Sequence, residues 1–239
     1  MDPTGRSALI TGGTKGIGRG IAEAMVDAGM DVLVTARTEA DVRAAEEALG
    51  ARGGGRALGA VCDVRDLQQQ RAAVARAVEA FGRLDVLVAN AGVGHFAAIE
   101  DLEPEAWQRV IDTNLTGAFY SVKAALEPIR AAEGLIVTIG SLAGTNFFAG
   151  GAAYNASKFA LAGFSQAVML DLRRHGVRVS TIMPGSVATH FGGHEPGEAD
   201  AWKIQPEDIA ELVLQLVRMP ARTLPSKIEV RPSRPPSAH

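Results

Sequence analysis

The chain has 239 residues, with 24 Lys and Arg against 27 Asp and Glu, a formal net charge of −3 and 47% hydrophobic residues. This balance gives nucleic-acid binding no electrostatic basis, and no apolar run reaches the roughly 18 residues of a membrane span. The single cysteine, Cys62, excludes an intramolecular disulfide and argues against a cysteine-based zinc site. The first residues lack the apolar core of a signal peptide, so we expect a cytoplasmic protein.

Seven short apolar runs alternate with amphipathic segments. The runs cover 8–11, 32–35, 57–62, 86–89, 135–139, 177–183 and 227–230, and most are continuous in Val, Ile, Leu and Ala, as in strands buried on both faces. Helical patterns cover 16–28, 39–49, 67–81, 104–130, 153–174 and 206–219. The alternation predicts one α/β domain over 1–239: a doubly wound, Rossmann-like parallel sheet of about seven strands with helices on both faces. We expect a disordered tail from about residue 232.

The first predicted strand leads directly into a glycine-rich turn, TGGTKGIG over residues 11–18. Glycines let the backbone approach a pyrophosphate closely, and the free N–H groups at the start of the following helix attract phosphate. The spacing differs from G-x-G-x-x-G, so the turn by itself does not name the nucleotide. It predicts a dinucleotide site formed by Gly12, Thr14, Lys15, Gly16, Ile17 and Gly18.

The end of the second predicted strand carries a base where NAD sites usually carry an acid. The strand ends in Ala36 and Arg37, and Lys15 lies in the glycine turn. A guanidinium and an ammonium together suit a 2′-phosphate, which predicts NADP(H) rather than NAD(H). Glu39 is close enough in sequence to oppose this assignment, and the alternative is that both cations are solvated surface charges.

A tyrosine and a lysine stand one helical turn apart at the start of the fifth helical pattern. Tyr154 and Lys158 are i and i+4, so they project from one face of the helix. A phenol has a reference pKa of about 10, and a nearby ammonium would lower it toward the range useful for acid–base catalysis. Ser141 follows the fifth strand, at the edge of the sheet where open α/β folds bind ligands. A Tyr/Lys pair at this spacing is, taken alone, more often an ordinary surface pair.

Taken in order, these motifs resemble the short-chain dehydrogenase/reductase family. Its members carry Thr-Gly-x-x-x-Gly-x-Gly, Asn-Ala-Gly after the fourth strand, a helix Asn, a Ser, Tyr-x-x-x-Lys and Pro-Gly-x-Val-x-Thr. The matching residues here are Thr11–Gly18, Asn90, Ala91 and Gly92, Asn114, Ser141, Tyr154, Lys158, and 184–189. The resemblance covers nearly the whole chain; one departure is Ala89, where many members have a second Asn.

The resemblance implies a catalytic role for four residues. Tyr154 would protonate the carbonyl oxygen during reduction and act as the base in reverse. Lys158 would lower the pKa of Tyr154 and hold the nicotinamide ribose. Ser141 would bond the substrate oxygen and stabilise developing charge. Asn114 would hold a water that relays protons from Lys158 to solvent.

The resemblance also implies further contacts with the dinucleotide. Asp63 and Val64 would lie against the adenine, and the turn of Asn90, Ala91 and Gly92 would support the cofactor. The nicotinamide carboxamide would be contacted by Pro184, Gly185, Val187 and Thr189. In this family the helices matching 104–130 and 153–174 form subunit contacts, so we expect a homo-oligomer, a dimer or tetramer.

Weaker signals lie in the loops. Phe147, Phe148, His95, Phe96 and Phe191 follow strand ends and could line an apolar substrate pocket, or serve equally well as core or subunit contacts. His190 and His194 have i, i+4 spacing, but the glycines between them oppose a helix, so we interpret them as loop histidines rather than metal ligands. Residues 191–203, which match a substrate lid in the family, are few and suggest a small lid and a bulky or tolerant substrate preference.

The function we predict is reversible hydride transfer from NADPH to a small-molecule ketone or aldehyde, of carbonyl reductase type. The alternatives are an NAD-dependent alcohol dehydrogenase and a non-catalytic nucleotide-sensing or scaffold protein on the same fold. A sensor would need none of the four residues assigned to catalysis. A 3-oxoacyl thioester, a diketone, a quinone and a sugar all remain open as substrates.

Overall fold

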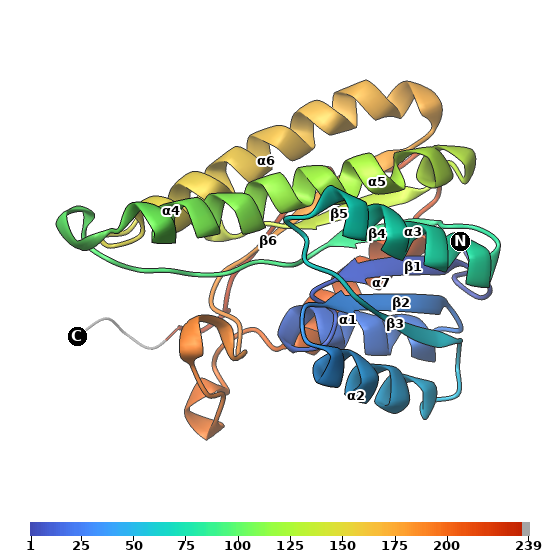
Figure 1. Ribbon diagram of the computed structural model, residues 1–239, viewed down its shortest axis with the longest axis horizontal. Helices are drawn as coiled ribbons and strands as arrows, with labels where there is room; N and C mark the ends of the chain where they lie inside the picture. Colours follow the sequence, from blue (N-terminus) through green and yellow to red (C-terminus); the bar gives the residue numbers. More distant parts are fainter. Residues whose placement is uncertain (236–239) are drawn as a thin grey trace.

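The computed structural model describes residues 1–235, and its centre is one parallel sheet of seven strands in the order β3-β2-β1-β4-β5-β6-β7 (Figure 1). The strands are β1 Ser7–Thr11, β2 Asp31–Ala36, β3 Ala57–Val61, β4 Val86–Ala89, β5 Leu135–Ile139, β6 Arg178–Pro184 and β7 Lys227–Val230. Every neighbouring pair is parallel, which confirms the predicted doubly wound sheet. Residues 236–239, part of the predicted tail, lie outside the described residues.

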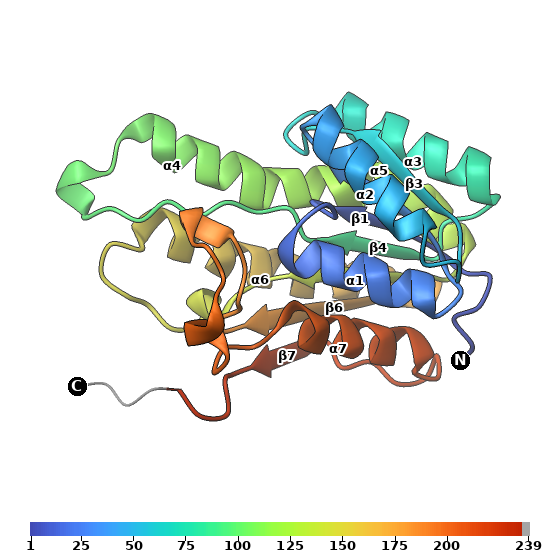
Figure 2. The ribbon, with the colours of Figure 1, turned by 90° about the horizontal axis from the view of Figure 1, so that it is seen from below.

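Helices cover both faces of the sheet, as Figure 2 shows from the side of α1 and α7. They are α1 Gly16–Asp27, α2 Glu39–Gly50, α3 Leu67–Phe81, α4 Pro104–Ile111, α5 Gly117–Ala131, α6 Ala152–Leu172 and α7 Pro206–Arg218. Successive residues of a strand point to opposite faces of the sheet and pack in different hydrophobic cores. Ile10 packs with the side chains of α1, α2 and α7, whereas Leu9 packs with those of α3, α5 and α6. Continuous apolar strands are therefore required, because each sheet face is buried.

The predicted helix over 104–130 is interrupted, and the sequence prediction is wrong at this point. Between α4 and α5 the backbone widens into π geometry over Asp112–Thr116. Asn114 lies in this turn, fully buried, and its side-chain amide bonds both the N–H and the C=O of Val93 and the hydroxyl of Ser157. Single π turns inside α-helices occur frequently at functional sites.

The segment between β6 and α7 is tied together by one buried carboxylate. Asp200 pairs with His194 and Lys203, at 2.6 Å each, and accepts the Gly197 N–H at 3.1 Å. His190 lies 3.4 Å from Glu195 in the same segment. Both histidines are in loops, as predicted, and His194 helps to hold the loop closed on itself.

Within residues 1–235, no helix combines the length and apolarity that crossing a bilayer demands. The same residues contain no cluster of three or more His, Cys, Asp or Glu side chains arranged to hold a metal ion.

Candidate active site

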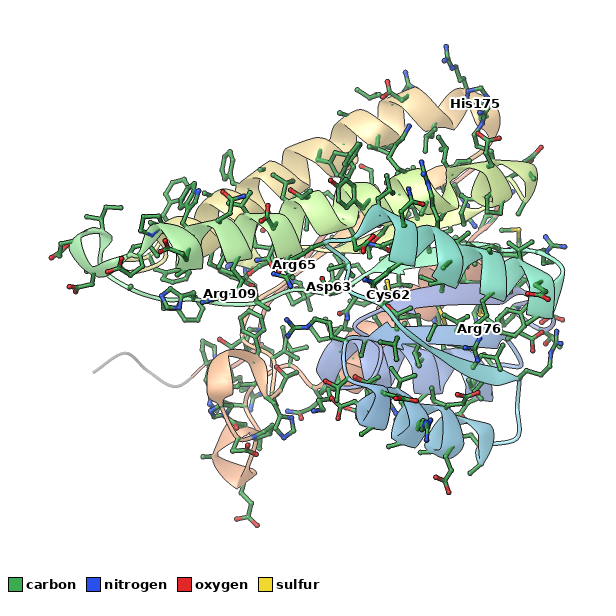
Figure 3. The ribbon with its side chains drawn as sticks, viewed as in Figure 1. Cys62, Asp63, Arg65, Arg76, Arg109 and His175 are labelled. Atoms are coloured by element: carbon green, nitrogen blue, oxygen red, sulfur yellow. The ribbon has the colours of Figure 1, made fainter. Side chains whose placement is uncertain are left out.

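The turns that follow six of the seven strands line one cleft of about 920 Å³ at the carboxyl edge of the sheet. Chain order reverses between β1 and β4, which sends neighbouring connections to opposite faces and opens a crevice between them. Cys62, Asp63 and Arg65, which follow β3, lie near the centre of the view in Figure 3. The fold thus gathers residues from distant parts of the sequence into one place.

The cleft is lined by every residue predicted for catalysis and for the dinucleotide except Gly18 and Asn114. Of the loop residues considered for an apolar pocket, His95 does not line it, whereas the four phenylalanines do: Phe96, Phe147, Phe148 and Phe191. Gly18 is buried beneath the turn, where a Cβ would lie 2.4 Å from the Asn90 amide nitrogen. That nitrogen donates to the carbonyls of Thr11 and Gly12, at 2.8 and 3.0 Å. Gly18 therefore makes room for the amide that holds the glycine turn in shape.

The glycine turn forms a cradle that a larger side chain would fill. Gly12 has a φ of +63°, and a methyl group on it would lie 3.0 Å from the Ala91 backbone. Lys15 precedes α1 and makes no side-chain cap to it, so the first N–H groups of the helix are left for another acceptor. A helix N-terminus open to a cleft is suited to phosphate.

Two cations stand at one end of the cleft, and one of them has an acidic partner. Arg37 is exposed and lines the cleft, whereas Lys15 lies 3.1 Å from the carboxylate of Asp41 on α2. Glu39, the acid that sequence reasoning considered, pairs with Arg43 instead. Asp41 was missed because nothing in the sequence indicates that the first turn of α2 faces the glycine turn.

The carboxylate of Asp63 is engaged by a neighbour. Arg65 bonds both of its oxygens, and this guanidinium holds the pKa of Asp63 below its usual range. The thiol of Cys62 lies beside it, buried, with a pKa raised by burial to about 11. Asp63 lines the cleft as predicted, but its charge is largely balanced by Arg65.

Tyr154, Lys158 and Ser141 meet at the other end of the cleft. Tyr154 and Lys158 come from the first turns of α6, and Ser141 follows β5 by two residues. The Lys158 ammonium donates to the Ile139 carbonyl at 2.9 Å and lies 5.8 Å from the centre of the Tyr154 ring. A proton donor, a buried cation and a second hydroxyl therefore converge on one point.

Burial controls the acidity of both α6 groups. It raises the pKa of the Tyr154 phenol, and the nearby Ser141 hydroxyl offsets part of this. It also lowers the pKa of Lys158 to about 8. We predicted that Lys158 lowers the pKa of Tyr154; in the protein without a dinucleotide, burial of the phenol acts in the opposite direction and sets the net shift. A protonated phenol at neutral pH is suited to donating a proton.

Asn114 lies behind this cluster rather than in the cleft wall. A methyl group at Gly92 would lie 3.3 Å from the Asn114 carbonyl oxygen and 3.6 Å from the Lys158 ammonium. The space at Gly92 is thus shared by the two residues. Both amide hydrogens of Asn114 are already donated within the protein, so water bound by its side chain would have to donate to the amide oxygen.

Further residues that sequence reasoning did not place in the site also line the cleft. They are Ala36, Thr38, Asp41, Cys62, Arg65, Val93, Thr113, Ile139, Gly140, Leu142, Ala143, Asn146, His190, His194 and Lys203. Most follow a strand directly, so their position after apolar runs is the signal that could have found them.

The residues present fit a phosphorylated dinucleotide. A glycine cradle stands at the start of α1, two cations lie toward β2, and an acid–base cluster lies toward α6. A phosphorylated dinucleotide carries its phosphates in the middle and its reactive ring at one end. The cradle, the cations and the acid–base cluster lie along one cleft in the matching order.

Comparison with known proteins finds relatives that match most of this chain. The profile of a family described as short chain dehydrogenase matches residues 6–198. A trans-4-hydroxycyclohexanecarboxylate dehydrogenase of Sinomonas cyclohexanicum is 37% identical over 87% of this chain and 84% of its own length.

Solved structures agree with this. A metagenomic short-chain oxidoreductase in complex with NADP superposes with a TM-score of 0.85 and 35% identity, covering 98% of this chain and 100% of its own. A short chain dehydrogenase from Mycobacterium paratuberculosis bound to NAD gives 0.88 and 30%, covering 96% and 97%. Similar folds thus hold either dinucleotide.

Proposed function

Because this chain belongs to the short-chain dehydrogenase family, we propose that it is an enzyme that reduces a ketone or aldehyde with NADPH, with Tyr154 as the proton donor. The observation that carries the proposal is the meeting of Tyr154, Ser141 and Lys158 at the end of a cleft that begins at a glycine cradle. The reaction is reversible, so the same site oxidises the corresponding alcohol.

When bound, the dinucleotide supplies the hydride, which is chemistry that no side chain can provide. The residues that would hold it are the glycine turn from Gly12 to Ile17, Arg37 and Lys15 toward the 2′-phosphate, Val64 and Asp63 toward the adenine, and 184–189 toward the nicotinamide. NADPH is favoured over NADH because the end of β2 offers a guanidinium and no acid at position 36.

The side chains of the protein orient the substrate carbonyl and transfer one proton to it. The Tyr154 hydroxyl donates its proton to the carbonyl oxygen as that oxygen gains negative charge, and the Ser141 hydroxyl donates a hydrogen bond to the same atom. Lys158, protonated below its pKa of about 8, stabilises the phenolate left behind and would hold the ribose hydroxyls of the bound dinucleotide. Asn114 ties the turn between α4 and α5 to Val93 and Ser157, beside Lys158.

The test is consumption of NADPH by the purified chain with a panel of ketones and aldehydes. Tyr154→Phe removes the proton donor and should lower kcat by roughly 10²–10⁴-fold, while the Kd for NADPH, measured by titration, stays nearly the same. Full activity in this variant would remove Tyr154 from the mechanism. NADPH binding without turnover of any carbonyl would favour the sensing or scaffold alternative.

A second candidate, an NAD-dependent alcohol dehydrogenase, is favoured by the Lys15–Asp41 pair. This pair places a carboxylate near the proposed position of the 2′-phosphate and occupies one of its two cations. The NAD-bound neighbour from Mycobacterium paratuberculosis is consistent with this alternative. The ratio of kcat/KM for NADPH to that for NADH separates the two functions.

A further inference from the structure

We propose that the cleft selects carbonyl compounds that carry an uncharged aromatic ring beside the reacting carbon, and that Phe96, Phe148 and Phe191 hold this ring. We call these three residues the phenylalanine cluster. The inference rests on the proposed function, since it names the substrate class of the same site.

The phenylalanine cluster surrounds the proposed proton donor. The ring of Phe96 meets Tyr154 edge to face, with centroids 5.6 Å apart, and the ring of Phe191 lies 5.5 Å from Tyr154. Phe148 continues the group, 5.8 Å from Phe96. The rings come from three separate connections, after β4, β5 and β6, so they are brought together only by the fold.

Glycines set the positions of these rings. A Cβ at Gly94 would lie 2.7 Å from the Phe191 ring and 3.0 Å from the Phe96 ring. A Cβ at Gly151 would lie 2.6 Å from the Phe148 ring. Each ring thus rests against backbone where any other residue would displace it, which gives the cluster a defined shape.

The rings are exposed to the cleft rather than packed away. Phe96, Phe148 and Phe191 are 50%, 47% and 39% exposed, and all line the cleft. Large apolar side chains gathered at that exposure mark a surface that a ligand covers. Aromatic rings favour other rings at centroid distances of 4.5–7 Å, in offset or edge-to-face geometry.

The distribution of charged side chains in the cleft also favours an uncharged substrate ring. The only acidic side chains of the cleft among the described residues are Asp41 and Asp63, which belong to the nucleotide end. Among the other basic side chains that line the cleft, Lys203 and His194 are both engaged by Asp200, and His190 pairs with Glu195. The part of the surface next to Tyr154 that the phenylalanine cluster forms is therefore apolar and aromatic, while the Lys158 ammonium is buried and bonded to the Ile139 carbonyl, and this suits an uncharged aryl group.

The experiment compares acetophenone with cyclohexyl methyl ketone, which have rings of similar size; because the aromatic ring is also conjugated with the carbonyl, binding is compared as well as turnover. We expect kcat/KM with NADPH to favour acetophenone roughly tenfold, since aromatic contacts add selectivity beyond apolar area. The affinities of both ketones for the protein in the presence of NADP⁺, measured by ligand-observed NMR, should differ in the same direction. The binding measurement does not depend on turnover.

Three variants test whether the cluster causes the preference. Phe96→Leu and Phe191→Leu keep an apolar side chain but remove the ring, and each should reduce the preference in binding and in kcat/KM. Gly94→Ala leaves every ring in the chain but displaces two of them, so it should also reduce the preference. Phe119→Leu is the matched control, because Phe119 lies on α5 and does not line the cleft.

The outcomes separate the two proposals. An aromatic preference in binding without any turnover supports the cluster and contradicts the proposed reaction. Turnover with equal or tighter binding of the cyclohexyl ketone, or a preference that Phe96→Leu, Phe191→Leu and Gly94→Ala all leave unchanged, overturns the cluster and leaves the reaction standing. Preferential binding of 4-acetylbenzoate over acetophenone would overturn the uncharged class.

Discussion

Arg37 and Asp41 carry opposite charges at the nucleotide end of the cleft, and both shape the choice of dinucleotide. Arg37 lies open to a 2′-phosphate, whereas Asp41 takes up Lys15 and repels such a group. We predict a ratio of kcat/KM for NADPH over NADH above one. Arg37→Asp should lower it by about tenfold or more, and Asp41→Asn should raise it.

The matched control for these variants is Arg43→Asp. Arg43 is an exposed arginine of α2 that pairs with Glu39 and does not line the cleft. Its replacement should leave the cofactor ratio unchanged. A wild-type ratio below one would reject the assignment of NADPH.

The buried ammonium of Lys158 makes folding stability depend on pH. Its pKa is lowered from 10.5 to about 8, so between these values the unfolded chain binds a proton that the folded chain does not. The free energy of unfolding therefore gains a contribution that rises with pH through this window, up to about 3 kcal/mol. Below pH 8 both states are protonated and the contribution is flat.

Lys158→Met should remove this contribution. Urea unfolding of both proteins without dinucleotide, at about pH 7.5 and pH 9.5, measures the difference between the two pH dependences. Other titrating groups contribute equally to both proteins and cancel. Identical pH dependences would show that Lys158 is not desolvated in the folded state.

At the scale of elements, one buried side chain caps the C-terminal end of α7. Arg178 on β6 is 7% exposed and donates to the carbonyls of Leu216 and Met219, at 3.0 and 3.4 Å. Arg178→Met would leave these carbonyls without their donor, at a cost of about 2 kcal/mol in the free energy of unfolding. Arg218→Met, on the exposed face of the same helix, should change it little. Equal effects in denaturant unfolding would contradict the capping role.

The strands and most helices could be predicted from the sequence, because strands buried on both faces are continuously apolar and the helices have regular apolar faces. The π turn over Asp112–Thr116 could not. Its position depends on where the Asn114 amide meets Val93 and Ser157, which are distant in the sequence. The spacing of apolar residues along the sequence does not depend on such a contact, so it predicts one uninterrupted helix over 104–130.

The residues of the candidate site could be predicted where a motif fixed their spacing, as for Gly12 to Ile17 and the Tyr154–Lys158 pair. The position of Asp41 and the pKa direction of Tyr154 could not be predicted. Both depend on distances and burial that arise only when separate connections meet at the sheet edge. Sequence reasoning gave the chemistry of the groups, and the fold determines their environments.

At the scale of the whole molecule, α6 presents an apolar outer face. Phe159 and Leu170 are 55% and 54% exposed and stand 11 residues apart, three helical turns, so they lie on one side of the helix. Exposed apolar surface of this kind commonly forms an interface. We predict that the 24.9 kDa chain self-associates.

Sedimentation velocity should show a dimer or larger species for the wild type. Phe159→Glu should shift it toward the monomer, because a carboxylate is costly to bury at such an interface. Ala75→Glu, which adds the same charge on the exposed side of α3, should have no effect. A monomeric wild type at micromolar concentration would contradict the prediction.

The position of the one thiol in the chain has a practical consequence. Cys62 lines the nucleotide end of the cleft, and its raised pKa keeps nearly all of it in the unreactive protonated form at neutral pH. A sulfhydryl reagent would therefore modify the chain slowly and at a single position. A bound dinucleotide would shield the thiol and slow the modification further. The labelling rate would therefore report how much of the protein has dinucleotide bound, even in variants that do not turn over a substrate.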